Sequence, residues 1–164
     1  MMRLGMKPLL KFLHLVAAIG FAGGLAVSML LAATVDESTG TSFAAGRRAI
    51  STVASTVTLP SLVLLVVTGM LLMIRQPVYF ESRWVRAKAV IGALAAGTML
   101  LAVQPAVTRM DGLAQMAVQG QPVLGPASSA LRFELIGGAA CLVLCLLAVA
   151  LAVWRPSLGW RGGE

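Results

Sequence analysis

Long uncharged runs, separated by short clusters of ionisable residues, are the main pattern of this chain. Four runs hold 20 to 26 residues each, at positions 12–35, 49–74, 89–108 and 135–154. A helix rises 1.5 Å per residue, so about 20 apolar residues cross the roughly 30 Å hydrocarbon core of a bilayer. The pattern predicts an all-α integral membrane four-helix bundle in one transmembrane domain covering residues 1–164, with spans at about 9–33, 49–74, 86–108 and 133–154.

A fifth uncharged run, at 112–131, is long enough by count alone but is rich in Gln, Ser, Pro and Gly. Lipid offers no partners for such side chains and backbone, so we expect a loop there, with a short interfacial helix at 110–118. The first apolar run is longer than the 7–15 residues of a secretory signal core, and we expect it to be retained as the first span.

Composition and charge agree with a membrane protein. Apolar residues make up 59% of the chain and charged residues only 12%, whereas soluble domains have about 25% charged residues. Nine Lys and Arg flank the side that holds the N-terminus, against four on the other side, which predicts that both termini are cytoplasmic. The basic side also suits anionic lipid head groups, and we expect no nucleic-acid partner because no basic domain lies outside the membrane.

Small residues on one face of each span predict close helix packing. The first span carries Gly20 and Gly24 in a GxxxG spacing, and Cys141 and Cys145 follow a small-residue stripe on the fourth. Such faces suit a compact bundle, a homo-oligomer or docking on a larger membrane complex. Pro60 falls inside the second span and should kink it.

Two charged residues, Lys88 and Glu134, sit at the ends of these inward faces. An inward position is expected because a charge that faces lipid is costly. Glu134 is a candidate either for carrying protons or for a salt bridge with Arg109 or Arg132 at the outer surface.

His14 is the only histidine, and it lies in the first span, where an ionisable group is a functional candidate. Two readings stay open: an axial ligand to haem iron or a copper ligand, or a histidine near the head groups that is hydrogen-bonded to a neighbouring helix. Met73 is expected at a similar depth on the inward face of the second span, as a second iron ligand or as plain apolar packing.

The third span begins in the same leaflet as His14, with Trp84 and Lys88 at its entrance. Lys88 is a candidate to pair with haem propionates or another carboxylate-bearing amphiphile, or else it only helps to set the topology. Trp84 fits the aromatic belt of the interface, and Arg83 and Arg86 fit topology signals.

The order of several short motifs resembles a superfamily of small membrane proteins. The motifs are Lys11-Phe12-Leu13-His14, Gly20-Phe21-Ala22-Gly23-Gly24-Leu25, Leu59-Pro60, Thr68-Gly69 and Trp84-Val85-Arg86-Ala87-Lys88. The superfamily includes HemJ-type protoporphyrinogen oxidases, CopD-type copper-resistance proteins and an uncharacterised branch of predicted integral membrane proteins, to which the chain is most similar. The resemblance implies haem b bound through His14, with Trp84 and Lys88 as family marks, in a bacterial-type inner membrane.

Three functions follow from these observations. The first is a haem b membrane protein in electron transfer or porphyrin- or quinone-linked oxidation, and so a candidate haem-dependent oxidoreductase. The second is a non-catalytic accessory subunit of a larger membrane complex. The third is a copper-handling or transport protein, although the nine methionines are scattered along the chain rather than clustered.

Overall fold

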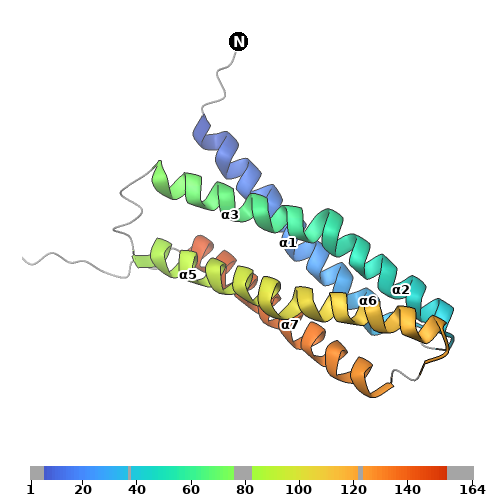
Figure 1. Cartoon of the computed structure of the whole chain (residues 1–164). Helices are drawn as coiled ribbons and strands as arrows, with labels where there is room; N and C mark the ends of the chain where they lie inside the picture. The colour runs from blue at the N-terminus through green and yellow to red at the C-terminus, as the bar shows by residue number, and fades with distance from the viewer. Residues whose placement is uncertain (1–5, 37, 76–82, 122–123, 155–164) are drawn as a thin grey trace, which may run out of the picture.

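Four long helical segments lie side by side in the computed structural model, which describes residues 6–36, 38–75, 83–121 and 124–154 (Figure 1). The described residues contain no strand. In chain order the elements are α1 (Met6–Thr34); α2 (Gly40–Val53), η1 (Ala54–Thr58) and α3 (Leu59–Ile74); α5 (Arg83–Thr98), η2 (Met99–Val103) and α6 (Gln104–Val118); and α7 (Leu124–Trp154). All four segments are long and apolar enough to cross a membrane. The predicted all-α membrane bundle is confirmed.

The helices run past the predicted spans at one end of the bundle. The second and third segments hold 35 and 36 residues, which is about 50 Å at 1.5 Å per residue. The helix expected at 110–118 is present as the last part of α6, but the loop expected for the rest of 112–131 is wrong in large part, because α7 already begins at Leu124. The physical reason is a second apolar cluster, which packs these extensions together: Phe43, Met110, Leu113, Ala114 and Ala130.

Local sequence signals determine where α2 begins and where α6 ends. Thr39 caps α2: its hydroxyl accepts from the Ser42 N–H at 3.1 Å, and the Ser42 hydroxyl accepts from the Thr39 N–H at 3.3 Å. At the end of α6, Gly120 adopts a φ of 75°, and its N–H donates to Ala117 while that of Gln121 donates to Met116. This is a Schellman motif, in which a glycine takes the left-handed position at little cost.

Both ends of the chain's helical part lie at the same end of the bundle. The N-terminus of α1, the C-termini of α3 and α7 and the N-terminus of α5 lie there, and we name this the His14 end (Figure 1). At this end α1 packs on α3 and α5 on α7, while α3 and α5 barely touch. At the opposite end α2, α6 and α7 pack together. The cytoplasmic orientation of the His14 end stays a prediction, and Arg3, Arg155 and Arg161 lie outside the described residues.

Close helix approach occurs where the glycines predicted it. A Cβ atom on Gly24 would lie 2.6 Å from the Thr58 hydroxyl oxygen, and one on Gly20 would lie 2.5 Å from that of Ser61. Both distances are shorter than a real Cβ contact, so α1 meets η1 and α3 only because these positions lack a side chain. Phe21 and Leu25, between and beside them, are fully buried in the central core.

The second and third segments each contain one π-helical insertion, η1 and η2, at their middle. In both, a proline follows two residues after the insertion, Pro60 and Pro105, and its missing N–H removes one helical hydrogen bond. Near Pro60 the hydroxyl of Thr56 donates to the Thr52 carbonyl at 2.7 Å, and that of Thr58 donates to Val53 at 3.4 Å. Both accepting carbonyls belong to the end of α2, directly before η1, and the proline predicted to kink the second span follows this π turn two residues later.

Candidate functional site

His14 lies on the face of α1 that packs against α3. Its Nδ1 is 3.0 Å from the hydroxyl oxygen of Thr68, a side chain that is almost completely buried. The Thr68 hydroxyl is also 2.6 Å from the carbonyl oxygen of Leu64, to which it donates its only proton. Thr68 can then only accept from His14, so the network assigns the imidazole proton to Nδ1 and leaves the lone pair on Nε2.

The neighbouring residue on α3, Gly69, lies against the imidazole ring. A Cβ atom there would be 3.3 Å from His14 Cε1, a distance tighter than most real contacts. The predicted partner Met73 is one helical turn further along α3 and is half-buried, whereas Met70 is exposed. Met73 therefore lies on the same side of α3 as Gly69, and its role as an iron ligand stays a prediction.

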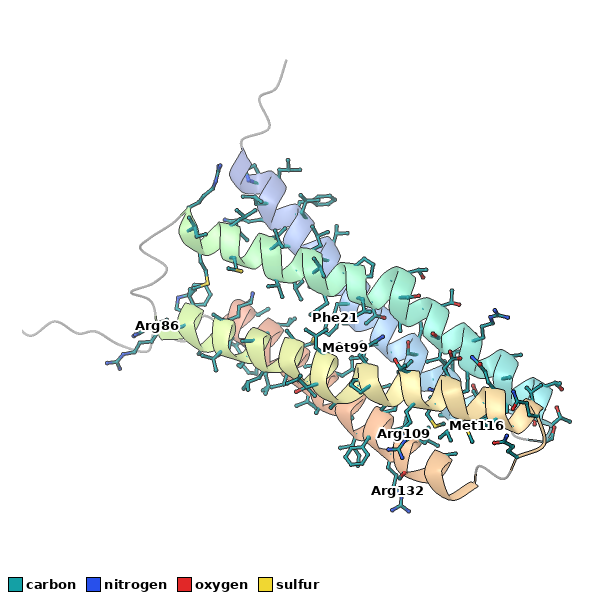
Figure 2. The ribbon with its side chains drawn as sticks, viewed as in Figure 1. Phe21, Arg86, Met99, Arg109, Met116 and Arg132 are labelled. Carbon is teal, nitrogen blue, oxygen red and sulfur yellow. The ribbon has the colours of Figure 1, made fainter. Side chains whose placement is uncertain are left out.

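The entrance of α5 brings cationic and aromatic side chains to the His14 end. Lys88 is half-buried and lies near the start of α5, at the same end of the bundle as His14. Trp84, one turn earlier, is also half-buried, while Arg86 is exposed and extends away from the bundle (Figure 2). The structure thus places Lys88 and His14 at the same end of the bundle and Arg86 at the surface, and the pairing of Lys88 with a carboxylate stays a prediction.

A second polar site lies toward the opposite end of the bundle. Arg47 Nη2 donates to Glu134 Oε2 at 2.6 Å, and both side chains are at most 4% exposed. The expected partners of Glu134 were Arg109 or Arg132, and this expectation is wrong: both are exposed at the surface (Figure 2). Glu134 faces the bundle interior, where α2 supplies the cation.

Arg47 is the residue that the sequence analysis missed. The predicted spans at 9–33 and 49–74 leave Arg47 outside the membrane, where it is one of the four basic residues counted on the outer side. Its helical spacing with Phe43 and Ile50, at i−4 and i+3, was the available signal, because these three residues share one buried face of α2.

Comparison with protein families identifies the chain at the level of a family. Residues 8–156 match the model of a family described as predicted integral membrane protein (DUF2269). The chain belongs to the DUF2269 family. No curated protein and no solved structure matches it. Membership of DUF2269 identifies an integral membrane protein, in agreement with the four apolar helices. The matched range includes every residue of both polar sites.

Proposed function

We propose that this protein binds haem b at the His14 end of the bundle, with His14 as the residue that would hold the iron, and acts in electron transfer or in porphyrin- or quinone-linked oxidation. The observation that carries the proposal is the hydrogen bond from His14 to Thr68. Histidines that ligate metals usually donate their other ring N–H to a neighbouring acceptor, which fixes the tautomer and the ring orientation. Here Thr68 is that acceptor, and Nε2 is the nitrogen left for iron.

The residues around His14 fit haem better than a metal held by side chains alone. Among the described residues, no group of three or more His, Cys, Asp or Glu is arranged to hold a metal ion. Haem brings four nitrogen ligands of its own and needs only one or two from the protein. Gly69 lets the imidazole ring lie close against α3, which helps to hold the ring orientation, because a Cβ atom there would be 3.3 Å from His14 Cε1. The resemblance of the His14 and Trp84–Lys88 motifs to HemJ-type proteins points to the same group.

The remaining roles follow from charge and position. Lys88, half-buried at the same end of the bundle as His14, is suited to pair with a propionate, since an ammonium facing lipid would be costly. Trp84 supplies an aromatic wall at the interface, and Met73 is the candidate second ligand. Bound haem would supply one-electron redox chemistry. The protein's own part is to orient His14 and neutralise the carboxylates.

The visible spectrum of the full-length protein, purified in mild detergent from haem-replete cells, tests the proposal. We expect Soret and α bands at about one haem per chain, and their loss in His14→Ala. Thr68→Val keeps the ligand but removes the acceptor, and we expect it to weaken haem binding about 10–100-fold. Met73→Leu should change the spin state of the haem iron, because it removes the candidate second ligand; an unchanged spin state would show that Met73 is not a ligand.

Two results would overturn the proposal. The first is a colourless protein that does not take up added haemin. The second is an unchanged spectrum in a folded His14→Ala variant. A stoichiometric partner that co-purifies with a colourless protein would favour the accessory subunit, and copper found in place of iron would favour the copper-handling protein.

A further inference from the structure

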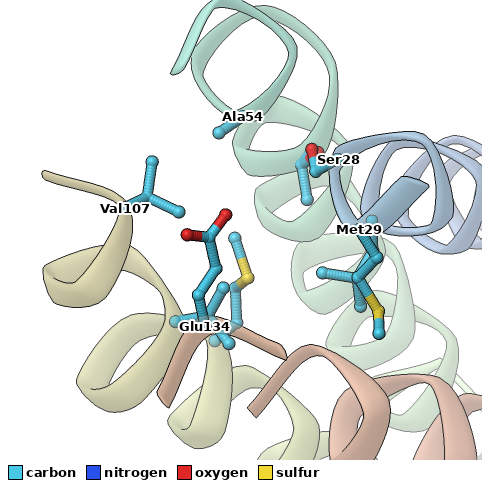
Figure 3. A pocket seen from close by; sticks show the side chains of 9 residues that line it. Ser28, Met29, Ala54, Val107 and Glu134 are labelled. Carbon is cyan, nitrogen blue, oxygen red and sulfur yellow. The ribbon is translucent and has the colours of Figure 1, made fainter. Parts of the chain in front are cut away.

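A small internal pocket lies away from the His14 end, where α1, the two π-helical insertions, α6 and α7 come together. Its polar lining consists of Ser28 from α1, Thr58 from η1 and Glu134 from α7 (Figure 3). Met29 and Met99 are among its apolar lining residues. The pocket has room for about one water molecule.

Two polar atoms at this pocket have no hydrogen-bond partner among the described residues: Ser28 Oγ and Glu134 Oε1. Both side chains are more than nine-tenths buried, and Figure 3 shows the Glu134 carboxylate directed between Ser28, Ala54 and Val107. Arg47 occupies only the other carboxylate oxygen, Oε2. An unpaired buried carboxylate oxygen is costly, so native proteins supply a partner for nearly all such atoms.

The charge and size of the pocket indicate which kind of molecule it can hold. Arg47 already neutralises Glu134 at 2.6 Å, so the site has no net charge with which to attract a cation or an anion. A carboxylate oxygen needs a donor, while the hydroxyl of Ser28 can donate or accept. Thr58 adds an acceptor, because its own proton goes to the Val53 carbonyl. A neutral molecule that donates and accepts, and fits the space of one water, satisfies these atoms.

The two π turns explain why the space exists at this depth. η1 contributes Ala54 and Thr58 to the lining, and η2 contributes Met99 and Val103. A π turn inserts an extra residue, and π-helical turns occur often at functional sites. Both central segments therefore deviate from α-helical geometry at the level where the unpaired polar atoms lie.

We propose that this pocket is an internal water-binding site, in which one water molecule donates to Glu134 Oε1 and is held by Ser28 and Thr58. The water pairs the carboxylate oxygen of Glu134 that Arg47 Nη2 leaves free, in the interior of a membrane bundle. The site does not depend on haem, because its residues lie away from the His14 end.

Radiolytic hydroxyl-radical footprinting tests the proposal, since radicals formed from a bound water oxidise the side chains beside it. Met99 lines the pocket and is 1% exposed; Met110 is equally buried at 2% but is not in the lining. We expect several-fold faster oxidation of Met99 than of Met110 in the wild-type protein. Met116, which is exposed, calibrates the radical dose.

The matched variant is Ser28→Val, which removes the hydroxyl and adds apolar volume to the pocket. Oxidation of Met99 should fall to the level of Met110, with Met116 unchanged. Equal protection of Met99 and Met110 in the wild type would show a dry pocket and overturn the proposal, and this comparison needs no variant. Undiminished Met99 oxidation in a folded Ser28→Val protein, or oxidation that changes when Na⁺ is replaced by choline, would overturn it as well.

Discussion

The buried Arg47–Glu134 pair gives the most direct test of how the bundle is stabilised. At the observed 2.6 Å and an effective dielectric constant of about 20, the attraction is about 6 kcal/mol. This attraction is offset by the cost of removing both ions from water, which is several kcal/mol for each. The pair as a whole therefore adds little, but each charge depends on the other.

Removal of one partner leaves the other charge buried and unpaired. We expect Arg47→Met and Glu134→Leu each to lower the free energy of unfolding by about 3–5 kcal/mol. The double variant should lose far less than the sum, because two apolar side chains replace the pair without leaving a charge behind. Arg48→Met is the matched control: Arg48 is adjacent and exposed, so its loss should change stability by no more than about 0.5 kcal/mol.

The assay is reversible unfolding in mixed detergent–SDS micelles, followed by far-ultraviolet circular dichroism and analysed as a double-mutant cycle. Additive effects of the two single variants would refute the reasoning, because they would mean that the two side chains do not depend on each other. Equal effects of Arg47→Met and Arg48→Met would refute it too, since burial would then make no difference.

Three further predictions concern packing, a helix end and a loop. Gly24→Val should lower the free energy of unfolding by about 1–3 kcal/mol, because the new side chain would clash with Thr58. The control is Gly23→Ala, which should not lower the free energy of unfolding because no atom lies within 4 Å of the added Cβ. Equal losses for the two variants in SDS unfolding would contradict the packing argument. Gly120→Ala should cost about 1 kcal/mol in the same assay, because φ is 75°, and no loss would argue against the Schellman motif. The Ser38 N–H and hydroxyl each bond a carboxylate oxygen of Asp36 and hold its pKa below the ordinary value. Ionised Asp36 therefore stabilises the loop at pH values above the pKa of Asp36 in the unfolded chain, and this stabilisation is lost as the pH falls through the pKa in the folded protein. NMR titration should show a higher pKa of Asp36 in Ser38→Ala. An unchanged pKa would contradict the hydrogen bonds from Ser38.

The sequence by itself determined the membrane-spanning helices. A run of 20 or more predominantly apolar residues is expected to cross the membrane as a helix, because a helix pairs its backbone groups within the segment, as lipid requires. The GxxxG spacing of Gly20 and Gly24 likewise predicted close approach from one helix alone, since a missing side chain leaves the same space in any partner arrangement. The orientation of the helices relative to the two sides of the membrane rests on the count of basic residues alone.

The tertiary structure decided which polar residues meet. Arg47 and Glu134 are 87 positions apart, and the sequence offered Arg109 and Arg132 as nearer partners. The long extensions of α2 and α6 pack through Phe43 and Met110. This packing places the Arg47 guanidinium against the Glu134 carboxylate. A hydrogen bond from His14 to a neighbouring helix was one of the two interpretations of the sequence, but only the packing of α1 on α3 identifies Thr68 as the partner. Periodicity indicates which face of a helix is buried, but only the packing of one helix on another decides which atoms on two such faces come into contact.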